Sequence, residues 1–178
     1  MNRKTTVGIL SLCLLLGVVS VLSPWGQMSK NAGPVTGATI SLWKICGKET
    51  MNGVSKSTCA NIPSSGNPNF PKHALYACRV LSILGLSLIL LNLVSVSHKK
   101  IFNKVNISLR KTKIPVSLLL LGLGSLCLLS SVMVWHYHLM SYSDAMGNKL
   151  NWDHDAGFNI MCVVAGISLV MSVLLMKN

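Results

Sequence analysis

Charge is scarce in this sequence, and acidic charge most of all. Of its 178 residues, charged ones make up 11%, and only four are Asp or Glu. A typical soluble domain has about a quarter of its residues charged. The shortage therefore argues against a soluble globular domain, and the hydrophobic content of 51% supports the same conclusion.

The sequence also lacks the residue patterns that carry chemistry. No Cys-x-x-Cys occurs, which argues against a thiol redox enzyme. There is no phosphate-binding loop, no internal repeat and no Ser, His and Asp set at a catalytic spacing. The sequence therefore predicts no catalytic residue, no cofactor and no enzymatic activity.

Long apolar runs are what the sequence has instead. There are four, and Arg79 is the only Lys, Arg, Asp or Glu in them: 6–23, 74–97, 115–137 and 156–176. A bilayer core about 30 Å thick needs roughly 20 apolar residues in helical form, so each run predicts a transmembrane helix. Arg3 and Lys4 before the first run also fit a secretory signal peptide. Pro24, just after the candidate cleavage site, favours a retained helix.

The basic residues are concentrated between the second and third runs and near the chain ends. The linker 98–114 holds six of them, whereas all four acids lie in the segments 24–73 and 138–155. The positive-inside rule therefore predicts that both termini and the linker are cytoplasmic. The other two segments are then the outer loops, in a plasma membrane or another membrane with an oxidising side.

Two consequences follow from this orientation. Anionic lipid headgroups are enough to explain the net charge of +12, so we expect the lipid bilayer and no nucleic acid as a partner. The sequon at Asn106-Ile107-Ser108 would be cytoplasmic and should carry no glycan.

The first outer loop would lie in an oxidising compartment, so Cys46 and Cys59 can form a disulfide there. Closing the loop should add about 3 kcal/mol of stability. Four further cysteines lie in the apolar runs and should be buried free thiols: Cys13, Cys78, Cys127 and Cys162. The β-branched segment Val35–Trp43 predicts a strand. A small sheet here would bury Trp43, while Trp25 suits the interfacial aromatic belt.

These features resemble the superfamily of claudins, peripheral myelin proteins and epithelial membrane proteins. Its first loop carries a Trp, then Gly-Leu-Trp-x-x-Cys, then a second Cys. The matching residues here are Trp25, Leu42, Trp43, Cys46 and Cys59. The segment Leu75–Leu81, which contains Arg79, is similar to the claudin Leu-Gln-Ala-Ala-Arg-Ala-Leu, and Gly124 and Trp135 in the third run also match.

The sequence departs from the family at several positions. Ser41 stands where the family has glycine, and Ala60 stands where charge-selective claudins often carry a charge. Only Lys177 and Asn178 follow the fourth run, so we expect no scaffold-binding tail of the tight-junction type.

The resemblance implies a mostly α membrane fold with a small β part, as a single domain over residues 1–178. The helices would form a left-handed four-helix transmembrane bundle, capped by a small antiparallel sheet from the first outer loop. Arg79 would brace that loop through backbone carbonyls or Glu49.

The implied function is that of a claudin-like integral membrane protein with a structural, adhesion or membrane-organising role through its outer loops. Its partners would be other membrane proteins or copies of itself. Two alternatives remain open. One is an auxiliary subunit of a larger membrane complex, and the other is a membrane-anchoring structural protein of a membrane-containing viral particle.

Two groups of side chains in the outer loops are candidates for contacts. Lys44, Lys48 and Lys56 are expected on an outer surface where Glu49 is the only acid of the first loop, which should attract anions and acidic partners. A second group gathers near the ends of the third and fourth helices: His136, His138, Asp153, His154 and Asp155. Such ligands suit zinc or copper. They follow no known metal-ligand spacing, so we expect a solvated cluster and no metal.

Overall fold

The computed structural model of the chain describes residues 3–28, 35–51, 54–62, 71–97, 106–109, 112–139 and 152–176. Its long helices are α1 (Arg3–Leu22), α2 (Lys72–Ser97), α4 (Val116–Val134) and α5 (Ala156–Met176), and α4 continues as the π-helix η1 (Trp135–Leu139). Within these described residues, four helices are long and apolar enough to cross a membrane. The prediction of four such helices is confirmed, with ends displaced by only a few residues.

Small and hydroxylic residues let α2 and α4 pack closely. A methyl group on Gly124 would lie 3.1 Å from the carbonyl oxygen of Gly85, so the two backbones approach where both residues lack a side chain. The hydroxyls of Ser82 and Ser131 are 2.8 Å apart, and the Ser131 hydroxyl donates to the Cys78 carbonyl at 3.0 Å. This polar pair ties the two helices together where water is excluded.

A five-stranded antiparallel sheet lies at one end of the helices. Its strands in spatial order are β4 (Val54–Asn61), β3 (Lys44–Met51), β2 (Val35–Ser41), β1 (Pro24–Met28) and β7 (Trp152–His154). The strand predicted at Val35–Trp43 is present as β2, without its last two residues. The prediction that the first outer loop, 24–73, supplies the whole sheet was incomplete, because β7 belongs to the segment between α4 and α5.

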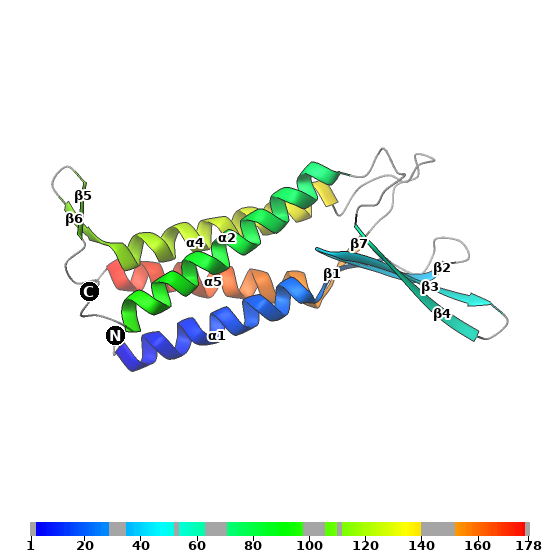
Figure 1. Cartoon of the computed structure of the whole chain (residues 1–178), viewed down its shortest axis with the longest axis horizontal. Helices are drawn as coiled ribbons and strands as arrows, with labels where there is room; N and C mark the ends of the chain where they lie inside the picture. The colour runs from blue at the N-terminus through cyan, green and yellow to red at the C-terminus, as the bar shows by residue number, and fades with distance from the viewer. Residues whose placement is uncertain are drawn as a thin grey trace.

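The helices lie side by side, with the five-stranded sheet beyond one end of them (Figure 1). The start of α1 and the end of α5 lie at the opposite end, together with β5 (Asn106–Leu109) and β6 (Thr112–Pro115). These two strands form an antiparallel hairpin, where the sequence predicted only a basic linker over 98–114. We refer to the two ends of the bundle as the sheet end and the hairpin end.

Candidate functional site

Most of the motif residues meet where the sheet joins the helices. Trp25 and Leu42 are fully buried there, Trp43 is half-buried, and Arg79 reaches the same place from α2. We call Trp25, Leu42, Trp43 and Arg79 the junction cluster. It determines how the sheet is held relative to the bundle.

Arg79 fastens the sheet to α2. Its Nε donates to the carbonyl oxygen of Leu42 at 2.6 Å, and its Nη2 donates to that of Ile62 at 2.7 Å. The guanidinium carbon also lies 5.0 Å from the centroid of the Trp43 ring and 5.4 Å from that of Tyr76, within cation–π range. The expected contact with backbone carbonyls is therefore present, and the side chain of Glu49 lies outside the described residues.

Trp25 anchors β1 between α1 and α5. Its indole Nε1 donates to the Ser20 carbonyl at 2.8 Å, and its ring packs edge-on against Trp135 at 5.1 Å. The exposed position expected of an aromatic-belt residue is wrong for Trp25, because β1 turns the side chain into the core, where it is 0% exposed. A methyl group on Gly157 would lie 2.6 Å from the Trp25 ring and 2.5 Å from the Pro24 carbonyl oxygen. Only glycine fits there.

Trp43 lies in the tight turn between β2 and β3. Its Nε1 donates to the Val21 carbonyl at the end of α1 at 3.1 Å, while its own carbonyl accepts from the Ile62 amide at 3.0 Å. The Ser41 hydroxyl accepts from the Lys44 amide at 2.9 Å. Ser41, at the position where the claudin motif has glycine, therefore stabilises this turn. Trp43 is half-buried rather than enclosed as expected.

The predicted disulfide is confirmed. Cys46 and Cys59 are directly opposed in the pairing of β3 with β4, and they are bonded. All six cysteines lie in the described part of the chain, and the other four are free. The disulfide joins β3 to β4, the edge strand of the sheet.

The three candidate surface lysines all belong to this hairpin. Lys44 is exposed at the start of β3. By backbone register Lys48 pairs with Ser57, and Lys56 pairs with Glu49, while the side chains of Lys48 and Lys56 lie outside the described residues. Residues 57–61 of β4 are exposed. Among the described residues of this hairpin, Lys44 and residues 57–61 are therefore the ones open to contact.

The histidine and aspartate group comes together only in part. His136 Nδ1 lies 3.0 Å from His154 Nε2, which links η1 to β7, and the His154 ring packs on Phe158 with centroids 4.0 Å apart. Partial burial and His136 lower the pKa of His154, with Asp153 opposing the shift. Within the described residues, no three His, Cys, Asp or Glu side chains are placed to hold a metal ion.

Sequence reasoning missed two parts of this site, β7 and Gly157. The Asp155 amide, directly after β7, donates to the Trp25 carbonyl at 3.1 Å, and the Ser20 hydroxyl donates to the Gly157 carbonyl at 2.5 Å. Both contacts join segments far apart in the sequence. Two features of the sequence pointed to this part of the molecule. One was the resemblance of Trp135 to the claudin motif, and the other was the expected grouping of His136 with Asp153, His154 and Asp155.

No protein-family model matches the sequence, and no curated protein matches it significantly. The resemblance to the claudin superfamily therefore rests on the motif residues themselves. Chemically, the junction cluster offers hydrogen bonds and ring packing that hold a sheet in place.

Proposed function

We propose that this chain is a claudin-like integral membrane protein with a structural, adhesion or membrane-organising role, exerted through contacts of its sheet outside the membrane. The proposal includes left-handed packing of the bundle and cytoplasmic termini. The sheet end then faces the extracellular space or an equivalent oxidising compartment, which agrees with the disulfide in β3 and β4.

The observation that carries this proposal is the fixed attachment of an exposed sheet to membrane helices. Arg79 holds two carbonyls of the sheet region, Trp25 is buried between sheet and helices, and the β3–β4 hairpin extends beyond the bundle (Figure 1). A rigidly held surface transmits contact to the membrane, as adhesion requires, whereas a mobile loop would first have to be ordered.

The surface also has a charge preference. Lys44 is exposed, and Lys48 and Lys56 belong to the same hairpin, opposed in sequence only by Glu49. Such a surface favours an acidic partner, on another membrane protein or on another part of a second copy. If it lines a path between cells, we expect that path to favour anions.

The test is expression of the labelled full-length chain in cells without junctions, mixed with non-expressing cells and with cells that carry a second label. A contact role across membranes predicts enrichment at borders between two expressing cells, and none at borders with non-expressing cells. The double variant Lys44→Glu and Lys48→Glu should reduce this enrichment, and in an epithelial layer it should shift the sodium/chloride dilution potential. Lys111→Glu with Lys113→Glu, in the linker 98–114, is the charge-matched control.

The alternatives give different results. An auxiliary subunit would show no border enrichment and would co-purify in mild detergent with a larger membrane complex in fixed proportion. A particle anchor would be recovered with a protein shell. Either result, with the protein present at the cell surface, would contradict the adhesion role.

A further inference from the structure

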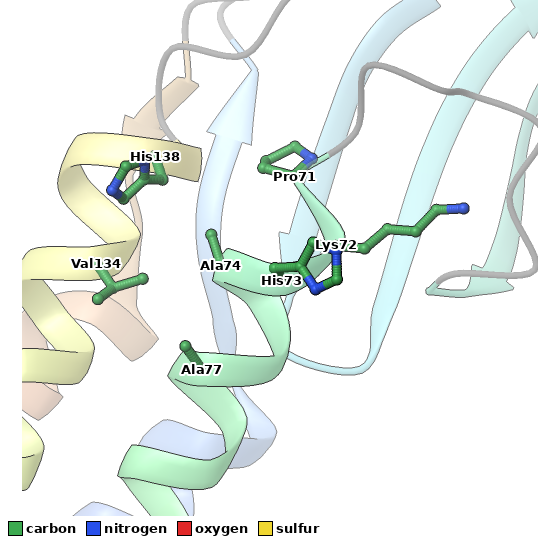
Figure 2. A pocket seen from close by; sticks show the side chains of 7 residues that line it. All are labelled: Pro71, Lys72, His73, Ala74, Ala77, Val134 and His138. Carbon is green, nitrogen blue, oxygen red and sulfur yellow. The ribbon is translucent and has the colours of Figure 1, made fainter.

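A pocket of about 610 Å³ opens at the sheet end, between the start of α2 and η1. Ala74 and Ala77 of α2 line one side, and Val134 and His138 line the other (Figure 2). No residue of the junction cluster lines it. One wall includes a π-helical turn, a rare element that is frequent at functional sites.

The pocket spans the level where a membrane changes from polar to apolar. The candidate spans are Lys72–Ser97 and Val116–Leu139, so Lys72, His73 and His138 lie at span ends, at the depth of lipid headgroups. Ala77 and Val134 lie about one helical turn further toward the middle of the bundle. The pocket therefore has a basic rim at headgroup depth and an apolar wall at the depth of the first acyl carbons.

The rim residues that the structure describes carry no negative charge. No Asp or Glu occurs among the described residues that line the pocket, and the first turn of α2 carries no acidic residue. Lys72 and His73 stand there instead, at the positive end of the helix dipole, where acidic side chains are normally preferred. An anion in the pocket would offset this unfavourable arrangement and would accept hydrogen bonds from the side chains.

Lys72 and the two histidines would act differently on such an anion. The Lys72 side chain extends away from η1 (Figure 2), and its four-carbon stem lets the ammonium group turn back to a ligand. His73 and His138 are shorter and can each donate an N–H in either charge state. Basic nitrogens above an apolar wall fit a phosphate group that carries acyl chains better than a small free anion.

We propose that this pocket binds an anionic membrane phospholipid, with Lys72, His73 and His138 contacting its phosphate and Ala77 and Val134 contacting its acyl chains. The lipid would bridge α2 and η1, close to Arg79, the α2 residue that holds the sheet. The inference requires the helices to span a membrane, and it does not depend on the adhesion role proposed above.

The test uses the full chain in nanodiscs of phosphatidylcholine with a minor fraction of phosphatidylglycerol, and measures by native mass spectrometry which lipids remain bound after release. We expect phosphatidylglycerol to be retained in excess of its share of the bilayer. The triple variant Lys72→Gln, His73→Gln and His138→Gln should reduce its retention at least about tenfold, the effect of losing one hydrogen bond to a charged group.

Two comparisons separate this site from general attraction of a basic protein to anionic lipid. Lys44→Gln removes the same formal charge on the sheet and should leave retention unchanged. Ala77→Phe keeps every charge, fills the apolar wall and should lower retention. The Cys46–Cys59 disulfide and the elution volume check the fold of each variant, and His138→Gln alone is the milder substitute for a misfolded triple variant.

Three results would overturn the proposal. The first is unchanged retention of phosphatidylglycerol in the folded triple variant. The second is a fall in retention in Lys44→Gln as large as that in the triple variant. The third is full displacement of the signal by inorganic phosphate while Ala77→Phe has no effect, which would identify a site for free phosphate instead.

Discussion

Arg79 is the residue whose chemistry is least replaceable at the junction. Its planar guanidinium donates in two directions, to Leu42 and to Ile62, and lysine, a compact point charge, cannot reproduce this fork. We expect Arg79→Lys to lower the free energy of unfolding by about 1–2 kcal/mol, the low part of the range for charge-assisted bonds because the side chain is only half-buried. Thermal unfolding in detergent, followed by tryptophan fluorescence, measures it. Arg3→Lys at the hairpin end is the control, and an equal shift there would count against the bracing role.

Gly157 makes a second prediction at the residue scale. An alanine methyl group would meet backbone oxygens at 2.5 Å (Pro24) and 3.0 Å (Ser20), and backbone cannot move aside as a flexible side chain can. Gly157→Ala should therefore cost about 1–3 kcal/mol through overpacking. Gly166 lies in the same helix with nothing within 4 Å of an added methyl group, so Gly166→Ala should be neutral or stabilising. Similar melting temperatures for the two variants would show that the close approach of β1 to α5 is not needed.

Trp25 shows where residue-level reading of the sequence fails. A tryptophan at the end of an apolar run is typical of the membrane interface. Its actual burial depends on β1 pairing with β2 and β7 and on the missing side chain of Gly157 across the chain. Of these partners, only β2 lies near Trp25 in the sequence; β7 and Gly157 are distant, so the local surroundings of Trp25 could not predict them.

At the scale of elements, the helices could be predicted and the short strand β7 could not. A membrane helix satisfies its own backbone hydrogen bonds, so a run of about twenty apolar residues is enough to predict it. Trp152–His154 is too short to show an alternating pattern, and it is a strand only because β1 has a free edge beside it. The disulfide was predictable for another reason, because Cys46 and Cys59 are the only cysteines outside the apolar runs.

The stability that the His136–His154 contact between η1 and β7 gives to the fold should depend on pH. The pKa of His154 is lowered from its ordinary 6.5 in the folded protein, by partial burial and by His136, 3.0 Å away between ring nitrogens. As pH falls through 6.5 the unfolded chain binds a proton that the folded chain still resists. Stability should therefore decrease with acidification from about neutral pH and level off below the folded pKa.

The measurement for this link is the melting temperature between neutral and mildly acidic pH, compared with the same series for His154→Gln. The variant should show a smaller acid loss, since it has no group to protonate at this position. Parallel curves for the wild type and His154→Gln would show that the histidine pair does not titrate with folding.

At the scale of the whole molecule, the two ends of the bundle differ in a way that predicts its orientation in the membrane. The disulfide-bonded β3–β4 hairpin lies beyond one end of the helices, and β5 and β6 lie at the other, with the start of α1 and the end of α5 (Figure 1). Basic residues cluster between α2 and α4, and a disulfide forms on the oxidising side of a membrane. Both signals predict that the hairpin end is cytoplasmic.

N-glycosylation tests this orientation directly, because a glycan is added only on the lumenal side and the sequon at Asn106 belongs to β5 at the hairpin end. In a eukaryotic secretory pathway we expect the wild-type chain to carry no glycan. The substitution Lys56→Asn creates a sequon with Ser57 and Thr58 on the edge strand β4, and should add one endoglycosidase-sensitive glycan. Asn106→Gln, alone and combined with Lys56→Asn, identifies the modified site. A glycan on the wild-type chain that Asn106→Gln removes would demonstrate the opposite topology. The sheet would then face the cytoplasm, where neither its disulfide nor an adhesive role could be maintained.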